Sequence, residues 1–203
     1  IEPQTVTDEL LEVCREADGR VCRHWHIPLQ SASDRLLRMM RRPYSADRFI
    51  ERVRAARNAM AGSTVGADVI VGFPGETEAD FSTGLALADS GLLDYLHVFS
   101  YSDRPGTPAA ELPDKVNPEV IRERVNRLKA ISRRRWRMAH QKSVGQILDV
   151  ICENRLAGDG HYRAVADNYL RVRMPQQVSG GRVIYPVRLT QASDDFAEAE
   201  LIA

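Results

Sequence analysis

The sequence predicts an α/β fold: half of an eight-stranded, TIM-like parallel barrel, followed by a small all-β barrel. Three observations carry this prediction. Strand and amphipathic-helix patterns alternate up to about residue 116, as in parallel sheets with right-handed βα crossovers. The clear strands in that region are too few to close a barrel, and half a barrel accounts for them. From Gly145 onward the pattern changes to short strands separated by turn residues.

The first segment begins with a helix over residues 5–16, which Thr7 can cap. Residues 24–30 read as a strand, in which a proline marks a strand end or a bulge. Residues 31–33 lead into a short helix, and Ser45 caps a longer one that ends near Gly62.

The central stretch is residues 67–77, a buried strand that stops at a tight turn and leads into a helix. Three consecutive apolar residues, 69–71, favour a strand covered on both faces. Gly72 and Gly75 permit turn conformations that other residues resist. Thr77 is a candidate N-cap, with Asp80 as its capping-box partner. Bare backbone beside a helix N-terminus is a good place to hold a polar ligand, although the local sequence alone favours an ordinary βα turn.

A helix over residues 78–90, a strand over 93–101 and a turn-rich loop over 102–108 complete the half-barrel. In such barrels the functional groups lie at the carboxyl ends of the strands. Those ends carry polar, glycine and proline residues here, and we expect them to share one ligand mouth. They are Glu2, residues 30–33, residues 72–76 and residues 100–107.

A long helix over residues 118–142 is strongly basic, and its charges indicate either a solvated face or a phosphate-contacting surface. Its basic side chains are Arg122, Arg124, Arg127, Lys129, Arg133, Arg134, Arg135, Arg137 and Lys142. The region after it has short strands at 146–153, 169–174, 181–189 and 196–202, with turns at 167–168 and 179–181. Arg171 and Arg173 share one strand face. Small barrels of this kind often bind nucleic acid along one sheet face. The predicted domains are therefore 1–116, 117–142 and 143–203.

Composition sets limits on partners and compartment. The 203 residues have a formal net charge of zero, so any nucleic-acid contact must come from a local patch. Cys14, Cys22 and Cys152 lack close-pair spacing, which favours a reducing, cytoplasmic compartment. No apolar run approaches membrane-spanning length, and we expect no membrane partner. The chain opens on Ile1 rather than Met, so we expect a piece of a longer protein.

His24, His26 and His97 are the candidate metal ligands. His24 and His26 share a strand face, as in the His-x-His sites of barrel hydrolases. Their strand ends near Gln30, however, which leaves them below the mouth, and no carboxylate stands at the end of the 93–101 strand. Interior histidines are therefore favoured, and the sequence predicts no metal site.

Four motifs in order resemble the radical-SAM tRNA methylthiotransferases. They are His26-Ile-Pro-Leu-Gln-Ser-x-Ser-Asp34, Arg41-Arg-Pro-Tyr44, Asp68-Val-Ile-Val-Gly-Phe-Pro-Gly-Glu-Thr77 and Leu96-His-Val-Phe-x-Tyr-Ser-x-Arg-Pro-Gly-Thr-Pro-Ala109. The last is most similar to the branch that acts on threonylcarbamoyladenosine in tRNA. The β region resembles a TRAM domain, the OB-like RNA-binding barrel that ends these enzymes. Two departures are Ala32, where the family usually has glycine, and Ser100, where proline is common.

The resemblance implies a transferase that uses S-adenosylmethionine to add a methylthio group to an adenine ring beside the anticodon. It implies cofactor contacts from Glu2, Gln30, Ser31, Gly72, Phe73 and Arg104, with the catalytic residues unknown. It implies tRNA contacts from Arg133, Arg134, Arg135, Arg137, Lys142, Arg171 and Arg173. The family's C-x3-C-x2-C motif for a [4Fe-4S] cluster is absent, and Cys14 and Cys22 lack its spacing. We therefore expect the C-terminal half of such an enzyme, without clusters and inactive alone.

Two alternatives stay open on the sequence. One is a stand-alone RNA-binding module whose half-barrel is only a scaffold. The other is a metal hydrolase that uses the histidines. An open half-barrel also exposes unpaired strand edges, so the sequence predicts a tendency to self-association.

Overall fold

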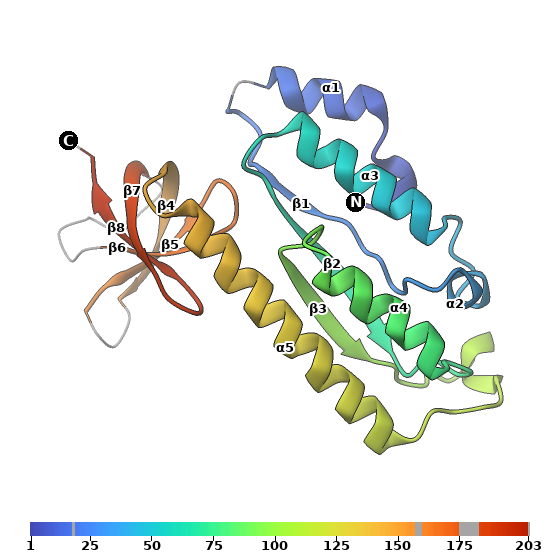
Figure 1. The fold of residues 1–203 in the computed structure, drawn as a ribbon. Helices are drawn as coiled ribbons and strands as arrows, with labels where there is room; N and C mark the ends of the chain where they lie inside the picture. Colours follow the sequence, from blue (N-terminus) through green and yellow to red (C-terminus); the bar gives the residue numbers. More distant parts are fainter. Residues whose placement is uncertain (18, 157–159, 175–182, 203) are drawn as a thin grey trace.

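The computed structural model describes residues 1–17, 19–156, 160–174 and 183–202. It contains a three-stranded parallel sheet, a long helix and a closed β-barrel (Figure 1). Within these ranges no helix is long and apolar enough to cross a membrane. The predicted turn at residues 179–181 lies outside the described residues.

The parallel sheet has the order β1-β2-β3, as the alternation of strands and helices predicts. Its strands are β1 (His24–His26), β2 (Thr64–Val71) and β3 (Tyr95–Ser100). The predicted strand over 24–30 is wrong in length: β1 ends at His26, and Gln30 rejoins the sheet through an isolated bridge to Val69. Pro28 lies in this gap on an edge strand, where its missing N–H faces away from β2, and the Ile27 and Leu29 amides still donate to Gly66 and Asp68.

Thr7, Ser45 and Thr77 cap their helices as predicted, and Ser33 does so as well: each accepts a hydrogen bond from a backbone amide of the helix it precedes. The predicted start of the first helix at residue 5 is wrong, because Pro3–Thr5 form a separate 3-10 turn and the α-helix begins at Asp8. Thr77 and Asp80 form the predicted capping box. The helices are η1 (Pro3–Thr5), α1 (Asp8–Glu16), α2 (Asp34–Met39), α3 (Ala46–Ala59), α4 (Glu78–Asp89), η2 (Pro108–Glu111) and α5 (Pro118–Ser143).

Helix α5 links the sheet to the barrel and is the longest element (Figure 1). Its apolar side packs against the first hydrophobic core through Val125 and Leu128. That core also holds the inner side chains of the sheet and of α3 and α4, including Phe49, Val53 and Phe81. The helix therefore belongs to the sheet unit by its packing, although its last turns reach the second core through Ala139.

The barrel has the strand order β4-β5-β6-β8-β7 and closes through β4 and β7. Its strands are β4 (Ile147–Leu156), β5 (Tyr162–Ala166), β6 (Arg171–Met174), β7 (Ile184–Ala192) and β8 (Ala197–Leu201). The sequence misses β5, because two of its five residues are alanines, which have weak strand preference. β6 and β8 pair in parallel, so the barrel is mixed.

The β5–β6 turn of the barrel docks on the amino end of the sheet. Arg23 donates two hydrogen bonds to the Asp167 carboxylate, at 2.6 and 3.0 Å. The Thr64 hydroxyl donates to the Asn168 carbonyl oxygen at 2.5 Å. The barrel therefore lies at the end of the sheet opposite to the carboxyl ends of its strands.

Candidate functional site

Gln30 lies at the carboxyl edge of the sheet in a left-handed conformation, with φ of 61°. Its amide donates to the Asp68 carbonyl at 2.8 Å, and its own carbonyl accepts from the Ile70 amide at 2.9 Å. The residue is buried. A non-glycine residue held in this region costs about 1–3 kcal/mol, and such residues cluster at ligand sites. The conformation turns the chain away from the sheet toward Ser31.

Ser31 and Ser33 form the turn that enters α2, and both are buried. The Ser31 hydroxyl oxygen accepts from the Ser33 amide at 3.1 Å. Ser33 caps α2 and donates its hydroxyl proton to Asp80 at 2.6 Å. The turn after β1 is thereby tied to the start of α4.

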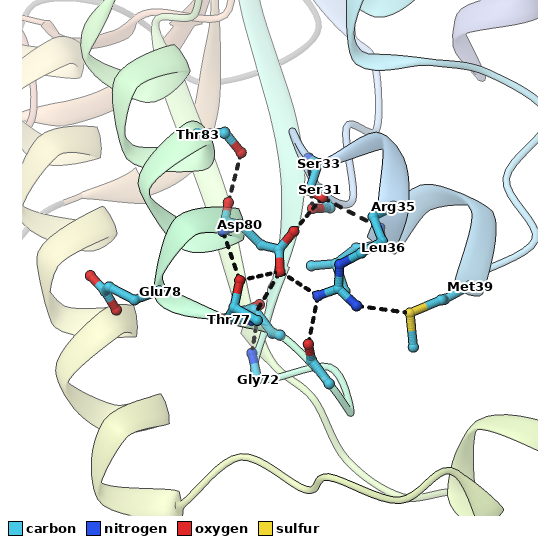
Figure 2. A network of polar contacts seen from close by, with 12 residues as sticks. Ser31, Ser33, Arg35, Leu36, Met39, Gly72, Thr77, Glu78, Asp80 and Thr83 are labelled. Carbon is cyan, nitrogen blue, oxygen red and sulfur yellow. Dashed lines mark hydrogen bonds and ion pairs between the residues drawn. The ribbon is translucent and has the colours of Figure 1, made fainter.

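Asp80 is the centre of the polar network at this edge (Figure 2). It accepts from the Thr77 amide and hydroxyl, from Ser33 and from Arg35, and Arg35 also donates to the Gly75 carbonyl at 2.6 Å. Burial opposes ionisation, but the hydrogen bonds from Arg35, Ser33 and Thr77 outweigh it and hold the pKa of Asp80 well below its usual value. The carboxylate is therefore charged at neutral pH and fixes both turns.

Gly72 and Phe73 follow β2, and both are buried. Gly72 has φ of +82°, and a Cβ placed there would lie 2.4 Å from Cδ1 of Ile121. Its amide donates to the Glu76 carboxylate at 3.1 Å. Glu76 pairs with Arg124 of α5 at 2.6 Å inside the protein. Burial raises the pKa of Glu76, and the Gly72 amide and Arg124 oppose that shift. This turn is therefore locked against α5.

Glu2 lies beside Arg42 on the same side of the molecule as the end of β1. One carboxylate oxygen of Glu2 is 3.4 Å from the Arg42 guanidinium, while Oε2 is buried without a hydrogen-bond partner. The Tyr44 hydroxyl donates to the Pro28 carbonyl at 3.2 Å, and burial raises the pKa of Tyr44 to about 12. The orphaned oxygen of Glu2 is free to accept a ligand hydroxyl.

Arg104 lies in the loop after β3 and is exposed. Within the described residues it forms no recorded ion pair, because its neighbour Asp103 is held by Lys115 at 2.5 Å and by the Tyr101 hydroxyl at 2.9 Å. A cavity of about 580 Å³ at this edge is lined by Arg35, Gly75, Glu76 and the segment 112–116. It includes none of Gln30, Gly72 and Arg104, so a single shared mouth for these residues stays a prediction.

The histidines have a partner that the sequence analysis overlooks. His26 Nε2 is 3.0 Å from the Asp68 carboxylate, and His97 Nδ1 is 3.3 Å from the same oxygen. Asp68 lies in β2, three residues before the strand ends at Val71. Because side chains alternate along a strand, Asp68 is on the same face of the sheet as His26 and His97. His24 is farther away, and burial followed by the nearby charge of His26 lowers its pKa to about 4. His24 is neutral at pH 7.

The predicted RNA-contacting residues of α5 divide into paired and unpaired groups. Arg135 is buried and donates to the Leu93 carbonyl, whereas Arg134 pairs with Asp89 and Arg137 with Asp194. Arg133 and Lys142 are exposed, and neither has an ion pair recorded in the described part of the chain. Of the predicted RNA contacts in α5, Arg133 and Lys142 are therefore the ones offered directly to a polyanion, and the exposed Arg122 and Lys129 of the same helix add to them.

Arg171 and Arg173 line a groove of about 640 Å³ on the barrel, together with Arg163, Tyr169 and Phe196. The Arg173 guanidinium stacks over the Phe196 ring at 4.6 Å and pairs with Glu198 at 2.8 Å. Arg171 is exposed. Aromatic rings beside arginines are the usual surface for single-stranded nucleic acid. The sequence analysis misses Tyr169 and Phe196, because a lone aromatic residue in a strand usually belongs to the core.

The carboxyl edge and the barrel groove lie at opposite ends of the sheet unit. Ile121 contacts the Gly72 turn, and Arg137 pairs with Asp194 of the barrel. These two positions are about 24 Å apart along α5 at 1.5 Å per residue. A small molecule cannot contact both, whereas a folded RNA can.

Comparison with known proteins shows what the chain is similar to. Residues 1–88 match the model of the Radical SAM superfamily. The chain is also 34% identical over 205 residues to a threonylcarbamoyladenosine tRNA methylthiotransferase, MtaB, of Bacillus subtilis. It is 40% identical over 149 residues to a tRNA-2-methylthio-N(6)-dimethylallyladenosine synthase of Mycobacteroides abscessus.

These alignments cover much of this chain and less than half of each relative. The MtaB alignment covers 100% of this chain and 45% of MtaB, and the second covers 73% and 29%. Coproporphyrinogen III oxidase of Escherichia coli, a radical SAM enzyme, superimposes with a TM-score of 0.53 at 15% identity. That superposition covers 87% of this chain and 45% of the oxidase and supports the fold alone.

The cysteines do not fit an iron–sulfur cluster. Cys14 lies in α1, Cys22 in the segment before β1 and Cys152 in β4, and all three are free. Among the described residues, the one group of His, Cys, Asp and Glu close enough to share a metal ion contains no cysteine. A cluster needs several thiolates around one centre, and the described residues do not bring them together.

Proposed function

We propose that the chain is the C-terminal portion of a tRNA methylthiotransferase. The observation that carries the proposal is α5, which is locked to the carboxyl edge of the sheet at one end and to the basic barrel at the other. The similarity to methylthiotransferases over the whole chain supports it. The barrel, residues 143–203, then serves as a TRAM-like, OB-like RNA-binding domain. The half-barrel occupies residues 1–116, and the connecting helix occupies residues 117–142. This role implies a cytoplasmic location, because the cytoplasm is the compartment that contains the tRNA.

S-adenosylmethionine, when bound, supplies the methyl group and the radical source of this family's chemistry. In the proposal, the buried Oε2 of Glu2 accepts a ribose hydroxyl, since it has no other partner. Gln30 and Ser31, at the carboxyl edge of the sheet, orient the methionine end. The backbone at Gly72 and Phe73 borders the adenine. Because the Gly72 amide already donates to Glu76, the Gly72 carbonyl is the group that is left to accept a hydrogen bond from the adenine. Because the sequence lacks the family's three-cysteine motif, we propose that this chain binds no cluster and is inactive alone.

The salt dependence of tRNA binding tests the RNA surface. Each phosphate contact adds roughly 0.7–0.9 to the slope of log K against log salt. We expect the triple change Arg133→Ala, Lys142→Ala and Arg171→Ala to reduce the slope by about 2–3. Arg48→Ala is the matched control, because Arg48 is exposed on α3 and pairs with Glu51. An unchanged slope in the triple variant would remove these residues from the RNA surface.

We further propose that threonylcarbamoyladenosine is the modified base that is read. Its threonyl carboxylate needs a cation, and Arg104 is exposed without a recorded ion pair among the described residues. We expect anticodon stem–loops with threonylcarbamoyladenosine to bind more tightly than those with dimethylallyladenosine. An arginine–carboxylate contact at an exposed site contributes about 1 kcal/mol, or roughly fivefold.

Arg104→Ala should abolish this preference and leave the salt slope of unmodified tRNA nearly unchanged. Equal binding of the two stem–loops by the native chain would contradict the threonylcarbamoyl proposal and leave the RNA surface standing. Self-association through the outer strands β1 and β3 is a separate proposal, which sedimentation of the chain at several concentrations tests.

A further inference from the structure

Three adjacent strands place a ligand-forming group on the same face of the sheet, away from both ends of α5. His26 comes from β1, Asp68 from β2 and His97 from β3, and Asp68 is the direct pairing partner of His97. One atom from each group lies within 4.8 Å of the others. The Asp68 oxygen is 3.0 Å from His26 Nε2 and 3.3 Å from His97 Nδ1.

We propose that His26, Asp68 and His97 bind one divalent transition-metal ion of the zinc class. Zinc holds imidazole nitrogens and carboxylate oxygens at about 2.0–2.2 Å, so ligand atoms in a tetrahedron are separated by about 3.3–3.5 Å. The two measured distances lie close to this range. Two imidazoles and one carboxylate are a usual donor set for such ions, and three protein ligands leave the remaining position open.

A chain of hydrogen bonds orients His26 for this role. The Thr64 hydroxyl donates to the Asn168 carbonyl, so its oxygen accepts from Nδ1 of His24 at 3.0 Å. His24 Nε2 then accepts from the Tyr95 hydroxyl at 3.2 Å. Having given its only proton, that hydroxyl accepts from His26 Nδ1 at 3.4 Å.

This chain of contacts presents His26 Nε2 to the Asp68 carboxylate. A cation at this position, either a proton on the ring or a bound metal ion, satisfies both groups. The Tyr95 hydroxyl is the kind of outer partner that fixes the ring of a metal-bound histidine. The side chain of His97 is half-exposed, so an ion from solvent can reach the group. A protonated His26 in a plain ion pair with Asp68 is the competing arrangement, and it predicts no metal uptake.

Metal uptake by the purified chain tests the proposal and does not depend on the proposed function. After equilibration with Zn²⁺ and gel filtration, we expect one equivalent of zinc per chain by elemental analysis. Substitution by Co²⁺ should give the visible absorption bands of a low-symmetry, four-coordinate site. A chain that retains no stoichiometric zinc overturns the proposal.

The variants separate this site from adventitious binding. His97→Ala and Asp68→Asn should each lose the cobalt bands. Tyr95→Phe, which removes only the outer hydrogen bond, should weaken zinc affinity by about 10–100-fold. His161→Ala is the matched control, because His161 directly precedes strand β5 of the barrel. This variant should bind zinc as the native chain does. Circular dichroism monitors folding, and unchanged cobalt bands in a folded His97→Ala chain would refute the site.

Discussion

Asp80 connects two turns at the carboxyl edge of the sheet through one carboxylate. It completes the capping box of α4 and also binds Ser33 and Arg35, which belong to the entry of α2. Its side chain is only 10% exposed, so these hydrogen bonds are poorly screened by water. The positions of the turns that carry Ser31 and Gly72 therefore depend on a residue that itself is not expected to touch a ligand.

We expect Asp80→Asn to lower the free energy of unfolding by about 1–2 kcal/mol, the typical effect of losing a charged helix cap. Urea denaturation measures this change. Asp47→Asn is the matched control, because Asp47 is an exposed acid in the first turn of α3, and it should cost only a few tenths of a kcal/mol. Equal losses in the two variants would contradict the network.

The same interaction has a defined pH dependence. Since the folded pKa of Asp80 lies below its ordinary value of 3.8, its stabilisation is complete above that value and is lost as the pH falls toward the folded pKa. The difference between native and Asp80→Asn stability should therefore shrink below about pH 4. A constant difference from pH 7 to pH 3 would show that the charge of Asp80 is not involved.

Individual residues were predictable where one local rule decides their role. Thr7, Ser45 and Thr77 are followed directly by helix patterns, and their hydroxyls cap those helices as expected. The pairing of Asp68 with two histidines could not be predicted, because it depends on the lateral register of three strands that are distant in sequence. Register between separate strands leaves no local signal.

Helix α5 is positioned by contacts with the turn after β2. Ile121 occupies the space over Gly72, and Arg124 forms a buried ion pair with Glu76. Sequence reasoning treats Arg124 as one of many basic side chains of a charged helix. Its burial is decided by the tertiary position of Glu76, which no periodicity reveals. Charge runs in a helix therefore predict a basic face only for the residues that the fold leaves exposed.

The contact between Gly72 and Ile121 predicts a coupled pair of substitutions. Gly72→Ala should lower the free energy of unfolding by about 2–4 kcal/mol, from the positive φ and from the overlap with Ile121. In the double variant Gly72→Ala/Ile121→Ala the overlap disappears, so the loss should be smaller than the sum of the single losses by at least about 1 kcal/mol.

Gly106→Ala provides the control for the conformational part of this effect. Gly106 also has a positive φ, of +80°, but nothing lies within 4 Å of the Cβ position. We therefore expect a loss of only about 1–2 kcal/mol. Thermal or urea unfolding measures all four variants. Strict additivity of Gly72→Ala and Ile121→Ala would show that helix α5 does not rest on the turn.

At the scale of the whole molecule, the barrel is attached at the amino end of the sheet. Arg23 and Thr64 bind the β5–β6 turn, so the basic groove and the carboxyl edge face different ends of α5. The alternation of strands and helices predicted the parallel sheet. The short strands separated by turn residues after Gly145 predicted the all-β region. The relative placement of the two parts could not be predicted, because it depends on surface contacts between segments more than a hundred residues apart.

We propose that one RNA spans from the barrel groove to the carboxyl edge along α5. Photo-crosslinking to tRNA from a benzophenone side chain at position 104 and, separately, at position 171 tests this placement. We expect crosslinks from position 104 in the anticodon loop beside the modified adenosine, and crosslinks from position 171 in a different part of the same tRNA. Crosslinks from both positions to the same few nucleotides, or none from position 104, would show that the RNA does not follow this path.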